Sequence, residues 1–147
     1  MKILLLALLS VMLFPLHAFA ADKGGAAAGA PTKIRLVFDN KEVVVSIFDN
    51  PAGRDFLSLL PLEAEFKDFA SEEKIAYLPR KLDTSGSPTP GQEQGDFTYY
   101  RPWGNLAVFY HGFGNSGQLT VLGRIESGKQ LLAGMNAPFS ARIEKVE

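Results

Sequence analysis

The chain has 147 residues, which allows one modest domain. It contains no cysteine, and this excludes disulfides, metal–thiolate sites and thiol catalysis. Basic and acidic side chains nearly balance, at 15 and 16, and no basic stripe alternates with aromatic residues, so nucleic acid is not an expected partner.

The first twenty residues have the three parts of a secretion signal. Met1 and Lys2 give a positive start, an apolar run follows, and Ala18 and Ala20 form a small-x-small cleavage site. The alternative is a membrane anchor, but the run has about 12 residues and a spanning helix needs roughly 20. A lipid anchor is not expected either, because acylation needs a cysteine directly after the cleavage site and the chain has none. We therefore predict a cleaved signal over 1–20, a periplasmic or secreted protein, and no membrane association after cleavage.

The rest of the chain divides into a short linker and one domain. Residues 21–31 are small and lack apolar periodicity, which predicts a flexible linker. The domain is expected over 32–147. It is rich in strand patterns, and Glu63 and Glu65 should face solvent because they alternate with apolar neighbours. The expected strands are 33–38, 43–48, 62–66, 75–78, 97–101, 106–110, 119–125 and 139–146.

Two helices and one long loop interrupt these strands. Asn50 is expected to cap the first helix, with Pro51 at its first position and Pro61 stopping it. Ser127 is expected to cap a second, shorter helix that ends at Gly134. The loop over 83–95 has two prolines and three glycines, and it is interpreted as either functional or simply mobile. Many short strands with few helices indicate a barrel or a sandwich.

Four stretches resemble the bacterial cyclophilin-like domain family. They are IFDNPAGRDFLSLLP at 47–61, EKIAYLPRKL at 73–82, GDFTYYRPWGNLAVFYHGFGNSGQL at 95–119 and LGRIESGKQLLAGM at 122–135. The resemblance covers nearly all of the domain. It implies a mainly β fold, a closed eight-stranded antiparallel barrel with two short helices.

A more distant resemblance to the peptidyl-prolyl isomerases implies that Arg80 could belong to a proline-binding site. That residue lies where the isomerases carry a catalytic arginine. No residue here matches their glutamine or their tryptophan-bearing segment. Weak isomerase activity is therefore kept as the second hypothesis, and the catalytic residues are left unassigned.

Other catalytic patterns are not evident in the sequence. The predicted mature chain has one histidine, His111, which is too few for an expected metal site, and no serine lies on a nucleophile elbow. No glycine-rich phosphate loop is found, and no cofactor is expected. The acidic residues from Glu63 to Glu73 are interpreted as a solvated face.

The binding hypothesis rests on a cluster of aromatic residues between Tyr99 and Phe113. Tyr99 and Tyr100 should point to opposite faces of their strand, and part of the cluster must fill the barrel. The remaining aromatics are expected to line a concave mouth that takes a peptide or a small organic ligand. A third hypothesis is a structural or interaction domain with a filled mouth and a flat apolar patch. The candidate ligand-binding residues are Arg80, Tyr100, Trp103, Phe113 and His111.

Overall fold

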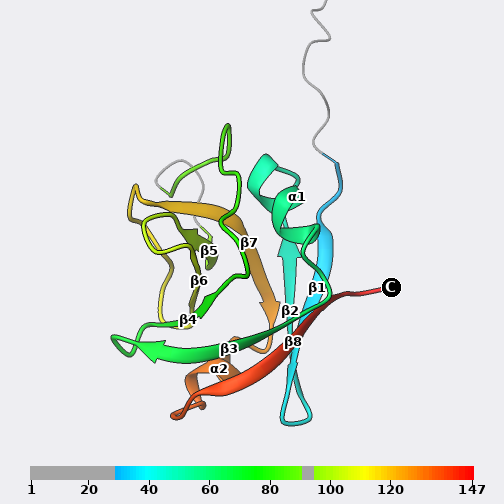
Figure 1. The fold of residues 1–147 in the computed structure, drawn as a ribbon. Coiled ribbons are helices and arrows are strands. Elements are labelled where there is room, and N and C mark those ends of the chain that lie inside the picture. The colour runs from blue at the N-terminus through cyan, green and yellow to red at the C-terminus, as the bar shows by residue number, and fades with distance from the viewer. Residues whose placement is uncertain (1–28, 91–94) are drawn as a thin grey trace, which may run out of the picture.

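The computed structural model describes residues 29–90 and 95–147. The predicted signal segment and most of the predicted linker lie outside the described residues. The domain has eight strands and two helices (Figure 1). In chain order they are β1 (Thr32–Phe38), β2 (Lys41–Ile47), α1 (Pro51–Leu57), β3 (Leu62–Phe69), β4 (Glu73–Tyr77), β5 (Phe97–Tyr100), β6 (Asn105–Phe109), β7 (Leu119–Ser127), α2 (Lys129–Ala133) and β8 (Phe139–Lys145).

The strands form a closed antiparallel barrel, as the resemblance implied. Its order is β1-β2-β7-β5-β6-β4-β3-β8, and β8 pairs with both β3 and β1. Asp39 and Asn40 connect β1 to β2 with positive φ angles of 45° and 57°, the conformation of a two-residue hairpin turn. Every strand therefore has a neighbour on each side, which leaves no open sheet edge.

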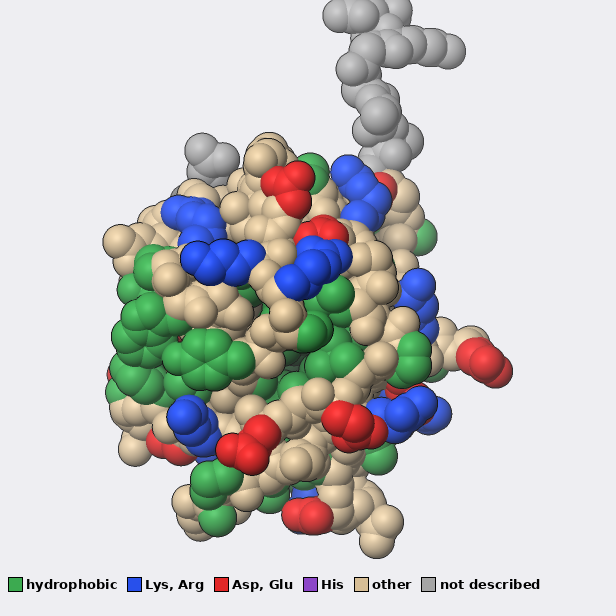
Figure 2. All heavy atoms as spheres, in the orientation of Figure 1, with side chains coloured by type: hydrophobic (Ala, Val, Ile, Leu, Met, Phe, Trp, Pro, Cys, Tyr) green, Lys and Arg blue, Asp and Glu red, His purple; other side chains and the backbone are tan. Residues whose placement is uncertain are grey.

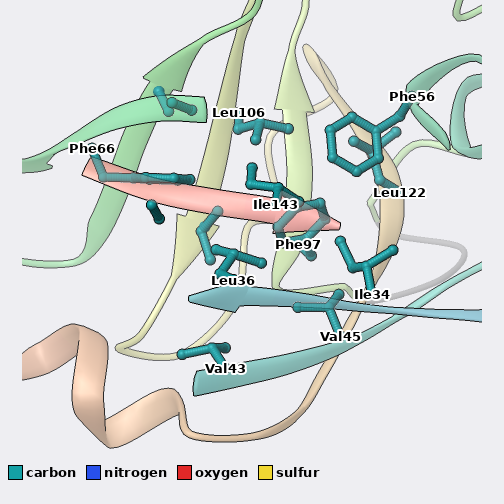
Figure 3. Packing of buried hydrophobic residues seen from close by; sticks show 14 of the residues in the cluster. Ile34, Leu36, Val43, Val45, Phe56, Phe66, Phe97, Leu106, Leu122 and Ile143 are labelled. Atoms are coloured by element: carbon teal, nitrogen blue, oxygen red, sulfur yellow. The ribbon is translucent and has the colours of Figure 1, made fainter. Parts of the chain in front are cut away.

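Apolar side chains from the strands fill the inside of the barrel. Figure 3 labels such side chains from α1 and from β1, β2, β3, β5, β6, β7 and β8, pointing toward one another, and Ala76 of β4 belongs to the same cluster. Glu63 and Glu65 are exposed while Ala64 and Phe66 between and beside them are buried, which confirms the alternation predicted for β3. The interior is thus a packed core.

Each helix covers one end of the barrel (Figure 1). Asn50 caps α1 as predicted, because its side chain accepts a hydrogen bond from the Gly53 N–H at 2.8 Å. The helix ends at Leu57, before the predicted stop at Pro61. The predicted cap of α2 is wrong. Ser127 is the last residue of β7, and Gly128, with φ of 84°, takes the N-cap position without a side-chain hydrogen bond.

A buried lysine lies at the end of the barrel near α2. Lys74 is 1% exposed, and its ammonium contacts Asp68 at 2.7 Å and donates to the Met135 carbonyl at 2.6 Å. Its ammonium also lies over the Tyr110 ring, 4.8 Å from the centroid. These contacts join β3, β4 and the segment after α2. The hydrogen bond from Lys74, with a second from the Tyr110 hydroxyl, holds the pKa of the Asp68 carboxyl below its usual range.

The described part of the loop after β4 packs against α1 and β7. The Ser87 hydroxyl accepts a hydrogen bond from the Ala52 N–H at 2.8 Å, and the Pro88 carbonyl accepts one from the Val121 N–H at 3.1 Å. Within the described residues, no helix is long and apolar enough to span a membrane.

Truncating a core ring should unfold the protein readily. Phe97 is fully buried and its ring lies 5.6 Å from that of Phe56, so Phe97→Ala should cost about 3–5 kcal/mol of unfolding free energy. Denaturant unfolding measures this. Tyr77→Ala is the control, because Tyr77 is 56% exposed and its truncation should cost about 1 kcal/mol or less. Equal losses for the two variants would contradict the packed-core description.

Candidate functional site

A cavity of about 390 Å³ lies on the outer wall of the barrel. Figure 2 shows apolar side chains gathered on the left of the view, the side where Figure 1 places β4, β5 and β6. The sequence predicted a concave mouth of the barrel, whereas this cavity is lined by outward-facing residues of the barrel wall. The lining residues come from these strands, the end of β3, the start of β7 and the adjoining turns: Phe69, Ala70, Glu72, Glu73, Tyr100, Trp103, Asn105, Ala107, Phe109, Ser116 and Leu119.

The floor of the cavity follows from strand alternation. Ala76 of β4 and Val108 of β6 pack in the core, so their sequence neighbours point outward. Glu73 pairs with Phe109, and Asn105 pairs with Tyr77 at the other end of β4. Glu73 and Asn105 are therefore four residue steps apart along this ladder, about 13 Å between Cα positions.

Three aromatic rings form one side of the cavity. The Trp103 ring lies 5.4 Å from that of Tyr100 and 5.7 Å from that of Phe69, both in edge-on arrangements. Trp103 belongs to the β5–β6 turn, in which Gly104 adopts a φ of 74° and donates to the Tyr100 carbonyl at 2.9 Å. Only a residue that tolerates this left-handed conformation closes the turn readily. Trp103 and Phe69 stay 50% and 42% exposed.

Asn105 brings an unpaired acceptor to this wall. The residue is 1% exposed, and its amide group donates to the Leu106 carbonyl at 2.8 Å. Its carbonyl oxygen, Oδ1, has no hydrogen-bond partner among the described residues. Because buried polar atoms are nearly always paired, an unpaired acceptor beside a cavity indicates a place for a ligand's donor.

Glu73 brings a carboxyl group held away from water. Burial raises the pKa of Glu73 to about 7, and the neighbouring charge of Glu72 adds to the rise. No hydrogen bond and no positive charge contributes to this shift. An unpaired carboxyl of this kind in a cavity is typical of functional sites.

The turn between β3 and β4 positions both Phe69 and Glu73. Ala70 and Ser71 in this turn have positive φ angles of 55° and 57°. The Asp68 carboxylate accepts a hydrogen bond from the Ser71 N–H at 3.0 Å. Nδ1 of His111 lies 2.9 Å from the Ser71 carbonyl, so His111 supports this turn instead of lining the cavity.

The structure brings together two of the five predicted ligand-binding residues. Tyr100 and Trp103 line the cavity, and Tyr99 points into the core, as strand alternation predicted. Phe113 lies beside a separate hollow of about 210 Å³ near Asp96.

Arg80 lies away from the cavity and faces α1. Its guanidinium contacts the two carboxylate oxygens of Asp55 at 2.6 and 2.8 Å and donates to the Ser58 hydroxyl at 3.1 Å. Hydrogen bonds from Arg80 lower the pKa of Asp55 to about 2. The described residues contain no group of three or more histidine or acidic side chains able to hold a metal ion.

Sequence reasoning missed Phe69, Glu73 and Asn105. The structure begins β4 at Glu73, two residues before the predicted start, so this glutamate alternates with the strand and leaves the solvated acidic run. Asn105 precedes the apolar Leu106, and strand alternation could have predicted that Asn105 points away from the core. No local pattern indicated that the Phe69 ring meets Trp103.

Replacing Glu73 by glutamine should change how stability depends on pH. The unfolded carboxyl ionises near 4.5 and the folded one near 7, so ionisation destabilises the folded protein as pH rises through that window. Glu73→Gln removes this loss. Its melting temperature should therefore gain on wild type between these values and keep that gain above them. Glu65→Gln, on the exposed face of β3, is the control, and a gain that does not vary with pH would contradict the prediction.

Comparisons with known proteins agree with the architecture. Residues 36–144 match the sequence model of the cyclophilin-like family. No curated protein sequence matches the chain. The solution structure of a hypothetical protein from Archaeoglobus fulgidus is similar, with a TM-score of 0.57, 17% identity, and coverage of 83% of this chain and 100% of that one. At this identity the likeness concerns the fold alone. Because the family model spans most of the barrel, this chain belongs to the cyclophilin-like family.

Proposed function

We propose that this protein is an exported binding module that holds a peptide or small organic ligand in the outer-wall cavity without transforming it. The observation that carries the proposal is the set of aromatic rings beside the unpaired Oδ1 of Asn105. Ligand sites are concave, mainly apolar, and contain a few polar groups that fix orientation. The cavity has these properties, and its volume lies within the usual range for small-molecule sites.

The lining supports binding without catalysis. Glu73 could accept a proton, but the hydroxyl groups of the described lining belong to Tyr100 and Ser116, and the Tyr100 hydroxyl donates to the Gln118 side chain at 2.9 Å. No described contact joins Glu73 to a nucleophile in the manner of an activated pair. The chemistry that the lining supports is recognition.

The isomerase hypothesis gains no support from the position of Arg80. Its guanidinium is held by Asp55, and the lining of the outer-wall cavity contains no arginine. A purely structural role is less well supported as well. The barrel interior is filled, but the aromatic surface outside it is hollowed where a docking patch would be flat.

Ligand binding should depend on the aromatic wall and not on Arg80. A panel of aromatic amines, aromatic alcohols and capped dipeptides is titrated against wild type, with thermal shift and calorimetry as readouts. Phe69→Ala should weaken binding about tenfold or more, since it removes one ring of the wall. Arg80→Ala is the control outside the cavity and should leave affinity unchanged. Equal binding by wild type and Phe69→Ala would place the ligand elsewhere.

Export rests on the sequence of residues 1–20 and has its own test. Expression of the whole chain with a secretion system should yield a mature protein that begins at Ala21, because Ala18 and Ala20 form the cleavage site. Intact mass and N-terminal sequencing of the exported protein measure this. Ala20→Leu, which spoils the small-x-small site, should slow processing. Exported protein that retains Met1 would overturn the assignment.

A further inference from the structure

We propose that the outer-wall cavity selects an organic cation that carries N–H donors, namely a primary ammonium or guanidinium group on an apolar body. This inference rests on the proposed binding function, because it names the chemical class of that ligand. The same chemistry occurs in free amines and in lysine or arginine side chains of peptides. Three features of the cavity support this selectivity: the sign of its charges, the orientation of Asn105 and the aromatic wall.

The first feature is the sign of the charges. Glu72 and Glu73 both line the cavity, and no lysine, arginine or histidine among the described residues does so. The lysine nearest in sequence, Lys74, points inside the barrel and is paired with Asp68. An anionic ligand would meet two carboxylates without a compensating cation, whereas a cationic ligand would supply the partner that Glu73 lacks. Buried charges in proteins are stable chiefly when they are paired in this way.

The burial of Glu73 supports the same conclusion. Its pKa is raised to about 7 because the cavity withdraws the carboxyl from water and Glu72 repels its charge. A bound ammonium group would offset both effects, because an adjacent positive charge favours the ionised carboxylate. The free site is therefore poorly satisfied as it stands, and a cation satisfies it better than a neutral molecule does.

The second feature is the orientation of Asn105. Its Nδ2 lies 2.8 Å from the Leu106 carbonyl, a distance that suits a donor and disfavours the flipped amide. Oδ1 is therefore left as an unpaired acceptor on a residue that lines the cavity. An unpaired acceptor selects ligands with N–H or O–H groups and costs free energy with ligands that lack them.

The third feature is the aromatic wall. Tyr100, Trp103 and Phe69 form a contiguous edge-on group, and Phe109 adds a fourth ring from the floor. The faces of such rings attract ammonium and guanidinium groups and also pack against apolar ligand bodies. A negative rim, a lone acceptor and aromatic faces are jointly the environment of a cation site.

Trp103 supplies the means of testing this inference, because it is the only tryptophan of the chain. Its emission under selective tryptophan excitation therefore reports on the cavity. The probes are 2-phenylethylammonium, 2-phenylethanol and 3-phenylpropionate, three molecules of similar size that differ in charge. The titrations are run above the pKa of Glu73. The ammonium should bind about tenfold more tightly than the alcohol, and the carboxylate should bind most weakly.

Glu73→Gln keeps the size of the side chain and removes its charge. It should weaken binding of 2-phenylethylammonium about tenfold and leave binding of 2-phenylethanol within about twofold of wild type. Glu65→Gln, an exposed carboxylate of β3 outside the cavity, is the matched control and should change neither. A capped peptide with lysine, compared with the same peptide carrying norleucine, tests whether the cation is accepted on a peptide.

The outcomes separate this inference from the function on which it rests. Equal affinities for the ammonium, the alcohol and the carboxylate would overturn the cation inference and leave the binding cavity intact. Loss of alcohol and ammonium binding to the same extent in Glu73→Gln would also overturn it, because the variant would then act through shape. No change of Trp103 emission with any probe, with no thermal shift, would overturn both.

Discussion

Closure of the barrel by β8 is the constraint on which the rest of the structure depends. This strand pairs with β1 on one side and β3 on the other, so it joins the two ends of an otherwise open sheet. Closure satisfies the strand edges without disulfides and leaves an interior packed mainly with apolar side chains. The cavity lies on the outer wall, over β4, β5 and β6.

Much of this fold could be predicted from local patterns. The eight strands and the Asn50 cap follow from alternation and from capping chemistry that involves near neighbours. The predicted cap of α2 was wrong because a serine before a short helix is a weak signal when that serine also pairs in a strand. Ser127 opposes Val44 at the end of β7, and Gly128 makes the turn. Choosing a barrel over a sandwich needed the family resemblance, since strand patterns alone do not record which strands close the sheet.

The candidate site was less predictable, because its parts meet only in three dimensions. Tyr100 and Trp103 could be singled out since they lie in one short segment. Arg80 could not be placed, because its partner Asp55 lies 25 residues away on α1. Phe69 reaches the wall from β3, and Glu73 looked like one more residue of an acidic surface until the pairing of β4 set its direction. The long-range geometry that decides burial is not written in any single segment.

The order of the strands also fixes which way the cavity faces relative to the chain ends. In an eight-stranded ring with this order, β6 lies four strands from β1 in either direction. The last residues run beside β1, where the Val146 N–H donates to the Lys33 carbonyl at 2.9 Å, and Figure 1 shows the C-terminus on that side. Attachment to a sensor surface or a carrier protein through the C-terminus would therefore leave the cavity on the side of the barrel away from the support, as an oriented receptor.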